Sequence, residues 1–278
     1  MTLIEQKLTT RKIGKTQVIT EPQLITVWGP PGATGKSTIA LNLSYELTIL
    51  GQRVILLDLD TYAPALNLLL PIQETSAGLS GVARLIRQGR FGPEALDRLS
   101  IGIKHGRHRL RFLPGLPNPS RWAEITPDTI EQLIAICKHN FDIIVADVSS
   151  SIEDAITSPD SPTSRNSAGR SAIRLSARTL VCLSGSKLSI ARYLNVFSAL
   201  NDLQKERILV INRGQTSDSL AKTIRGLTKE RIDCQIPNDE PALQLAESQL
   251  LPLALARRKS PARNAIAALA HKLLAWAP

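Results

Sequence analysis

The most informative segment of this chain reads Gly29-Pro30-Pro31-Gly32-Ala33-Thr34-Gly35-Lys36-Ser37-Thr38. The apolar run 24–28 before it is typical of a buried strand, and the periodic segment 37–50 after it predicts a helix. A glycine-bearing loop between strand and helix that ends in Gly-Lys-Ser cradles phosphates, since its backbone N–H groups turn inward, its lysine supplies a point charge and its serine can hold Mg²⁺. The predicted nucleotide-binding residues are Gly32, Ala33, Thr34, Gly35, Lys36, Ser37 and Thr38.

The segment departs from the usual phosphate-loop spacing at one position. In the pattern G-x-x-x-x-G-K-[ST] the first glycine would fall at Pro30. The alternative is a plain Gly/Pro turn before a helix, but such a turn does not require Lys36 and Ser37 together after Gly35. We therefore favour the phosphate loop.

Two further predicted strands end in aspartates. Asp58 and Asp60 close one strand, and Asp147 closes another. Ligands in open α/β sheets bind beyond the carboxyl ends of the strands, so we expect these acids to face the phosphates. They would then also face the Mg²⁺ that Ser37 can hold, so the predicted metal residues are Ser37, Asp60 and Asp147. The alternative is that each acid only caps the helix that follows it.

The segment after the predicted strand 207–211 bears on the choice of base. It reads Asn212-Arg213-Gly214-Gln215, and Gln215 stands where guanine selection needs a carboxylate. Hydrogen-bond chemistry therefore favours adenine, with Asn212 on the base edge, although Asn212 could instead simply end the strand. The predicted ligands are ATP and Mg²⁺.

Outward from these motifs, short apolar runs alternate with helical patterns along most of the chain. Strands are predicted over 24–28, 53–58, 110–113, 141–148, 179–184, 207–212 and 232–236. Helices are predicted over 37–50, 79–88, 93–99, 128–138, 188–203, 219–229 and from about 261 onward. This order predicts an α/β fold, a doubly wound and mostly parallel sheet with helices on both faces.

The organisation of the chain also follows from composition. We predict a flexible basic tail over 1–22 and one domain over 23–278, with a long loop over 149–171 that is rich in Ser, Asp, Pro and Arg. The polar start lacks the apolar segment of a secretory signal, so we expect a cytoplasmic protein. The three cysteines lie in apolar segments and predict small buried hydrophobes rather than a disulfide set or a metal cluster: Cys137, Cys182 and Cys234.

The charge balance is strongly basic. The chain has 34 Lys and Arg against 24 Asp and Glu, a net charge of +10, which favours contact with polyanions. Arg170, Arg174 and Arg178 recur every four residues, so on a helix they would form one stripe able to touch DNA phosphates. The alternative for this stripe, as for the basic run 84–111, is a solvated face.

The last predicted helix has an apolar face that allows two interpretations. Its members are Ala262, Ile266, Leu269, Leu273 and Leu274. The face could lie on a membrane as a peripheral contact, but more often such a face covers the sheet. His105 and His108, three residues apart and without an evident third ligand, read as solvated.

Taken together, these motifs resemble the MinD/ParA family of P-loop ATPases, most closely its CpaE/TadZ-like pilus-assembly branch. The resemblance runs from about residue 24 to the end of the chain. It rests on the segments 32–38, 58–60, 141–147, 210–213 and Ile236-Pro237-Asn238-Asp239.

The resemblance implies roles for individual residues. Asp60 matches the switch I aspartate that positions the attacking water, so Asp60 and Lys36 would be the catalytic residues. Asp58 is its structural neighbour, and Asp147 matches the Walker B acid, which acts on Mg²⁺ through water. The base would lie near Asn212, Arg213, Pro237 and Asn238.

The resemblance also implies partners and places. Proteins of this family dimerise face to face on ATP and then bind a membrane, DNA or a protein of a pilus, secretion or partition system. The chain would be recruited to the membrane, the cell pole or the nucleoid. The receiver-like domain of many CpaE proteins is not among the 278 residues.

One departure from the family bears on catalysis. The family's signature lysine would fall five positions before Lys36, where Pro31 stands. Loss of such a trans charge could cost about 10³ to 10⁵ in rate, if an arginine finger is a fair guide. Three functions stay open: a slowly hydrolysing switch that positions a pilus or secretion assembly, a DNA-partitioning ATPase, and a non-hydrolysing scaffold.

Overall fold

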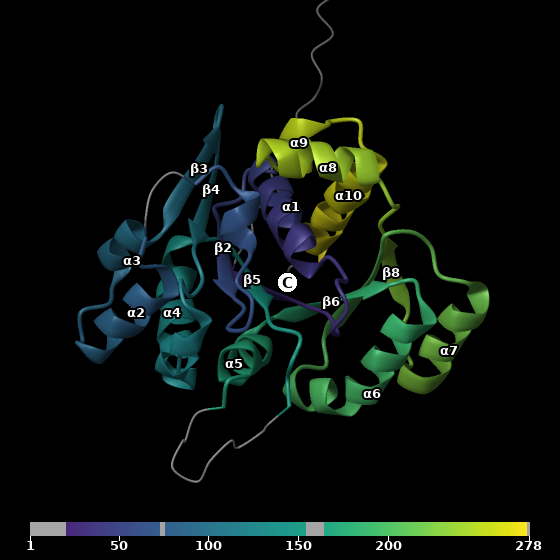
Figure 1. Cartoon of the computed structure of the whole chain (residues 1–278), viewed down its shortest axis with the longest axis horizontal. Coiled ribbons are helices and arrows are strands. Elements are labelled where there is room, and N and C mark those ends of the chain that lie inside the picture. Colours follow the sequence, from purple (N-terminus) through teal and green to yellow (C-terminus); the bar gives the residue numbers. More distant parts are fainter. Residues whose placement is uncertain (1–20, 73–75, 154–163, 277–278) are drawn as a thin grey trace, which may run out of the picture.

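The computed structural model describes residues 21–72, 76–153 and 164–276. Its centre is an eight-stranded sheet in the order β3-β4-β2-β5-β1-β6-β7-β8 (Figure 1), in which only the β3–β4 pair is antiparallel. The strands are β1 Gln23–Trp28, β2 Val54–Leu59, β3 Ile101–His105, β4 His108–Leu113, β5 Ile143–Val148, β6 Arg178–Ser184, β7 Arg207–Asn212 and β8 Ile232–Gln235. This is the doubly wound, mostly parallel fold predicted from the sequence.

Helices cover both faces of the sheet (Figure 1). The α-helices are α1 Lys36–Ile49, α2 Gly78–Arg87, α3 Pro93–Leu99, α4 Pro127–Asn140, α5 Ser167–Leu175, α6 Lys187–Leu203, α7 Asp218–Thr228, α8 Glu240–Gln249, α9 Leu253–Ala256 and α10 Pro261–Ala275. Two short 3₁₀ helices are η1 Leu66–Leu69 and η2 Pro119–Glu124.

Alternation along the strands builds two cores. In β1, Ile25 and Val27 face a cluster with α1 and α10, whereas Leu24 and Trp28 face a cluster with α4, α5 and α6. Successive strand residues point to opposite faces, so a strand covered on both sides must be apolar throughout. The continuous apolar runs that predicted the sheet have this cause.

Four elements differ from the prediction. Strand β3 and helices α8 and α9 were not predicted, and α5 begins at Ser167, inside the predicted loop 149–171. The antiparallel β3 pairs only with β4 at the edge of the sheet, where half of its side chains face solvent and its apolar pattern is weak. The predicted tail 1–22 lies almost wholly outside the described residues.

The predicted arginine stripe is wrong. Arg170 and Arg174 lie on α5, but Arg178 begins β6, where it pairs with Ile25 of β1. The Arg178 guanidinium donates to the backbone carbonyl of Trp276 at 3.0 Å and lies 5.6 Å from the centre of its ring. The helix ends because the strand is needed in the sheet, so the three arginines do not share one helix face.

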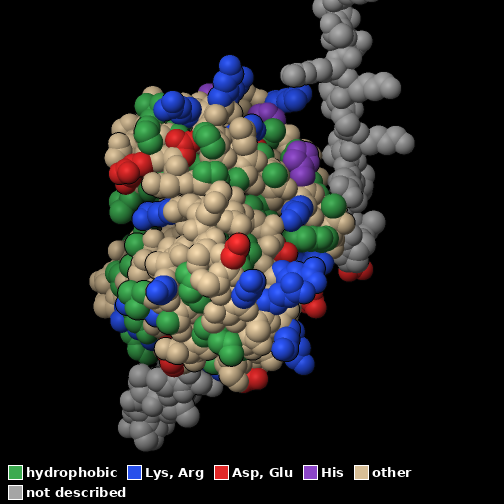
Figure 2. Space-filling view, turned by 90° about the vertical axis from the view of Figure 1, so that its right-hand side faces the viewer, with side chains coloured by type: hydrophobic (Ala, Val, Ile, Leu, Met, Phe, Trp, Pro, Cys, Tyr) green, Lys and Arg blue, Asp and Glu red, His purple; other side chains and the backbone are tan. Residues whose placement is uncertain are grey.

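The apolar face of the last helix covers the sheet. All five of its predicted members on α10 are buried, and the helix packs along α1. Among the described residues, no helix is long and apolar enough to span a bilayer. Figure 2 shows the side of the molecule that carries α7 and β8, where Lys and Arg side chains gather with acidic ones among them. Cys137 and Cys182 are buried as predicted, and Cys234 is half-buried.

Candidate functional site

The Gly-Lys-Ser segment forms a tight loop between β1 and α1. Gly35, the residue before the helix, has φ 81°, and Gly32 has φ 117°, both in the left-handed region that favours glycine. The carbonyl of Thr34 accepts hydrogen bonds from the Asn212 amide at 2.9 Å and from the Cys182 thiol at 3.1 Å. The loop is therefore held in shape by the ends of β6 and β7.

Lys36 lies between two carboxylates that the sheet brings to it. Its ammonium is 2.9 Å from Asp60 Oδ2 and 3.7 Å from Asp147 Oδ1, and the side chain is only 14% exposed. Burial lowers the pKa of Lys36, but Asp147 and Asp60 outweigh burial and hold the pKa above its usual value. Three residues far apart in the sequence thus meet at the carboxyl end of the sheet, as predicted for a phosphate site.

Asp58 and Asp147 lie directly opposite each other on β2 and β5. Both are buried, and burial followed by the charge of Asp147 raises the pKa of Asp58 to about 8. Burial also raises the pKa of Asp147. Asp58 accepts the backbone N–H groups of Asp60 at 3.2 Å and Leu66 at 3.1 Å, so its carboxylate shapes the loop after β2.

Asp60 is the acid of the group whose pKa is lowered. Its Oδ1 accepts the backbone N–H groups of Tyr62 at 2.9 Å and Ala63 at 3.0 Å. Burial by itself would raise the pKa of Asp60, but Lys36 and these N–H groups outweigh burial and hold the pKa below its ordinary value.

The oxygens near Ser37 suit Mg²⁺. Asp147 Oδ1 is buried and accepts no hydrogen bond from the described residues, which leaves an acceptor for a metal-bound water. Mg²⁺ prefers carboxylate and hydroxyl oxygens and keeps several waters, so Ser37, Asp60 and Asp147 are a suitable donor set.

A cavity of about 640 Å³ opens over these groups. Of the predicted residues it includes Asp60, Arg213 and the loop from Ala33 to Thr38. Pro237 and Asn238 are exposed and lie outside its lining, but Ile236 before them accepts the Gly214 N–H at 3.0 Å, which places them beside Arg213.

Two residues near the cavity were missed by sequence reasoning. Arg192 of α6 donates to the carbonyl of Pro31 at 2.8 Å, and a Cβ on Gly32 would lie 2.6 Å from the same nitrogen. Within the described chain, Arg192 forms no ion pair. Glu247 of α8 lines the cavity from the other side. Nothing in the local sequence around either residue indicates this position, because both arrive there through packing of distant helices.

The loop after Asp60 is tied to the segment that precedes α5. The Tyr62 hydroxyl donates to Asn166 Oδ1 at 2.9 Å, and Thr61 Oγ1 donates to the Arg165 carbonyl at 3.0 Å. The Arg165 guanidinium lies 4.0 Å from the centre of the Tyr62 ring. Movement of one loop would therefore strain the other.

Comparison with known proteins agrees with this geometry. The profile of the CobQ/CobB/MinD/ParA nucleotide binding domain matches residues 25–253. The chain is 33% identical over 99 residues to an iron-sulfur cluster carrier protein of Aquifex aeolicus, a match that covers 36% of this chain and 24% of that protein. The chain thus spans only about a quarter of the length of that curated relative.

Solved structures share the fold at low identity. A ParA family ATPase from Chlorobium tepidum matches at a TM-score of 0.76 and 20% identity, covering 91% of this chain and 99% of that one. MinD from Pyrococcus horikoshii, complexed with Mg-ADP, matches at 0.70 and 18%, covering 91% and 96%. The MinC:MinD complex of Aquifex aeolicus matches at 0.66 and 21%, covering 91% and 96%. At these identities the likeness shows the fold.

Proposed function

The chain belongs to the family of CobQ/CobB/MinD/ParA nucleotide-binding domains, and we propose that it is an ATP-binding switch whose residues 23–278 act as one ATPase domain. The observation that carries the proposal is the ammonium of Lys36 held by Asp60 and Asp147. In this arrangement the ammonium that would bind phosphate oxygens is paired with two carboxylates instead. Nucleotide binding would replace these carboxylates by phosphate oxygens as the partners of Lys36.

That exchange of partners would rearrange two segments of the switch, the loop after Asp60 and the segment before α5. Once Lys36 turns to the β- and γ-phosphates, Asp60 loses its partner and is free to orient a water for attack on the γ-phosphorus. Bound Mg²⁺ would supply charge neutralisation of the phosphates, with Ser37 as a ligand and Asp147 accepting from a metal-bound water. Because Tyr62 hydrogen-bonds Asn166, the rearrangement after Asp60 would reach the segment before α5.

We propose that Arg192 supplies the positive charge that the family's signature lysine would bring at the position of Pro31. Its guanidinium already contacts that position of the loop without an acidic partner in the described chain. A cation near the transferring phosphoryl group stabilises its charge in the transition state. Slow hydrolysis is therefore proposed, rather than none.

Self-association and cargo extend the proposal. The residues quoted above resemble the CpaE/TadZ-like branch, which supports an ATP-dependent homodimer that positions a pilus or secretion assembly at the membrane or cell pole. Exposed Tyr62 and Leu68 at the rim of the cavity offer apolar surface for a second copy. The corrected position of Arg178 removes the observation that motivated DNA partitioning, so we do not propose that function.

The test combines nucleotide binding, phosphate release and sedimentation on the wild type, Lys36→Ala and Asp60→Ala. We expect ATP to bind with Mg²⁺ more tightly than GTP, Lys36→Ala to weaken binding by about 100-fold or more, and Asp60→Ala to retain binding but lose turnover. Lys222→Ala, an exposed lysine on α7, is the matched control and should behave as wild type. ATP binding without any turnover would instead establish the non-hydrolysing scaffold, and no ATP binding would overturn the switch.

A further inference from the structure

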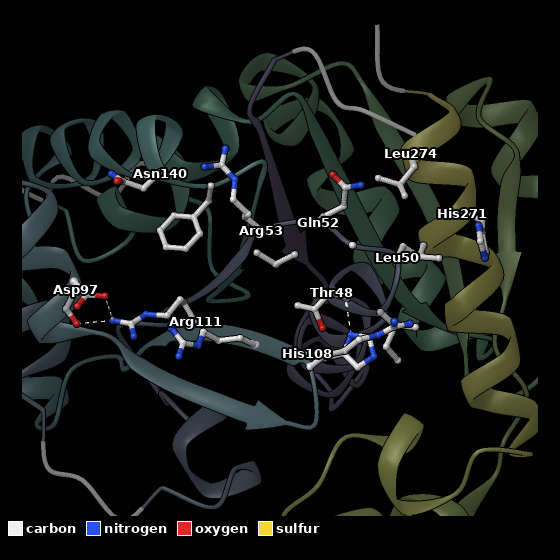
Figure 3. Close-up of a pocket in the computed structure, with 16 residues that line it drawn as sticks. Thr48, Leu50, Gln52, Arg53, Asp97, His108, Arg111, Asn140, His271 and Leu274 are labelled. Carbon is white, nitrogen blue, oxygen red and sulfur yellow. Dashed lines mark hydrogen bonds and ion pairs between the residues drawn. The ribbon is translucent and has the colours of Figure 1, made fainter. Parts of the chain in front are cut away.

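A second and larger cavity lies at the opposite end of the sheet. Its volume is about 990 Å³, and it opens between the end of α1, the start of β2, the β3–β4 hairpin, the end of α4 and α10 (Figure 3). None of its lining residues belongs to the nucleotide cavity. It therefore needs its own explanation.

Arginines dominate the charged lining of this basic cavity. They are Arg53, Arg107, Arg109 and Arg111, against one acid, Asp97. His108 and His271 also line it. Arginine forks match phosphate oxygens, and four of them converge here from two chain segments.

Two of the arginines are held in place. Arg53 binds Asp142 through Nε at 3.0 Å and Nη2 at 2.6 Å. Arg111 binds Asp97 at 2.7 Å (Figure 3). Nη1 of Arg53 and Nη1 of Arg111 donate no hydrogen bond to any described residue. Both guanidinium groups therefore keep N–H donors for a ligand. Because their acids fix them, these guanidinium groups would lose little conformational entropy on binding.

The other two arginines have no acidic partner among the described residues. Arg107 and Arg109 are exposed on the β3–β4 hairpin, and neither forms an ion pair within the described chain. The helices α1 and α4 end at this cavity, and each carboxyl end contributes about half a negative charge. His108 Nδ1 already lies 3.3 Å from the Thr48 carbonyl at the end of α1. After Asp97, Asp142 and both helix ends are counted, about one positive charge still lacks a counterion in the part of the chain that the structure describes.

Part of the remaining lining is apolar, with the polar residues Thr48, Gln52 and Asn140 among the apolar ones. The apolar side chains of Leu50, Val54, Phe141 and Leu274 would suit a ring or another apolar group. Arg111, only 17% exposed, lies deep enough that the backbone of a DNA duplex would reach mainly the hairpin arginines. The shape and the mixed lining therefore favour a small ligand over nucleic acid.

We propose that the basic cavity binds a small phosphorylated ligand that also carries a ring, of the nucleotide class. Arg107 and Arg109 would contact the phosphates from the hairpin, Arg53 and Arg111 would meet them with their remaining donors, and the apolar part of the lining would hold the ring. This site is separate from the phosphate loop and does not depend on ATP hydrolysis.

Adenosine 3′,5′-bisphosphate is a suitable probe, titrated calorimetrically into the full wild-type chain and, separately, into Lys36→Ala, whose phosphate loop should bind nucleotide weakly. We expect equal binding of the probe in both cases, weaker binding of pyrophosphate, and none of adenosine, because both phosphate and ring contribute. Absence of binding to the wild type, or loss of binding in Lys36→Ala, would overturn the proposal.

The double variant Arg107→Ala/Arg109→Ala tests the assignment to this cavity. We expect it to weaken the probe about 10- to 100-fold without changing thermal unfolding, since both side chains are exposed. Arg257→Ala/Arg258→Ala removes the same charge from another exposed loop and should have no effect. An equal loss of probe affinity in the control would mean that the effect comes from the net charge of the protein and would contradict the assignment to this cavity. Binding of random duplex DNA through the hairpin arginines without binding of the probe would assign the surface to nucleic acid instead.

Discussion

The two ends of helix α1 lie at two differently built surfaces, at both of which we propose that anions bind. At its start, Lys36 is balanced by Asp60 and Asp147 within 4 Å. At its end, four arginines surround a cavity and outnumber the acids near them. The start of a helix carries positive partial charge and its end negative partial charge.

This difference explains the different composition of the two surfaces. At the amino end of α1 the backbone itself attracts phosphate, so a single lysine suffices and buried acids can tune it. At the carboxyl end the backbone opposes an anion, and several arginines are needed to reverse the local charge. The following predictions are arranged from the largest expected effect to the smallest.

The largest effect is expected at the nucleotide end, from Arg192→Ala. If its guanidinium supplies the charge missing at Pro31, ATP turnover should fall about 100-fold while ATP affinity changes much less. Single-turnover kinetics would separate the two quantities. Arg192→Lys should restore part of the rate, and Arg174→Ala on the exposed side of α5 should not change it. Turnover at the wild-type rate in Arg192→Ala would mean that Arg192 only stabilises the conformation of the loop and takes no part in hydrolysis.

At the basic cavity, Arg111→Ala should lower the stability of the fold without changing the affinity of the phosphate loop for ATP. Its guanidinium donates to Ser100 and to Asp97, so its loss should lower the free energy of unfolding by about 2 kcal/mol. Urea denaturation would measure this, with the exposed neighbour Arg109→Ala expected to change stability by less than about 0.5 kcal/mol. A large change in ATP affinity would mean that α1 couples the two ends.

The acids at the two ends should respond to pH with opposite sign. Asp58, with a pKa raised by burial to about 8, binds its proton more tightly in the folded state, so its contribution to stability falls as pH rises from about 4 to 8. Burial would raise the pKa of Asp142 as well, but Arg53 outweighs burial and lowers it, so its contribution is present above about pH 4 and is lost on acidification.

The measurement is stability against pH in EDTA without nucleotide. Asp58 can contribute a slope of at most about 1.4 kcal/mol per pH unit, which Asp58→Asn should flatten between pH 5 and 8. Asp142→Asn should leave that slope unchanged and reduce stability at neutral pH. An unchanged slope in Asp58→Asn would show that Asp58 is ionised throughout this range.

The smallest effect is expected away from both ends, at Arg178. Its hydrogen bond to the Trp276 carbonyl and its contact with the ring should be worth about 1 kcal/mol or less. Thermal unfolding of Arg178→Ala would show the loss, whereas Arg174→Ala should unfold as wild type. Any affinity for random DNA should be the same in both variants, because the two arginines do not form one stripe.

Much of the nucleotide end could be predicted from the sequence. The strand-loop-helix segment around Lys36 is contiguous, and the rule that ligands meet the carboxyl ends of parallel strands placed Asp60 and Asp147 beside it. The alternation of apolar strands with helices likewise predicted the sheet and its two helical layers. The roles of these residues in hydrolysis and metal binding stay predictions.

Other features required the folded chain. Asn212 was predicted on the base edge, but its amide is hydrogen-bonded to the loop at Thr34. Arg192 reaches Pro31 across 161 positions of sequence, and strand β3 is recognisable mainly by its partner β4.

The physical reason is the range over which sequence patterns act. Helical periodicity, strand alternation and a phosphate loop are local, so the sequence by itself determined the α/β class and the position of the nucleotide end. The basic cavity joins residues from Thr48 to Leu274, each unremarkable in its own segment. Only the packing of α1, α4, α10 and the edge hairpin around one sheet brought these charges together.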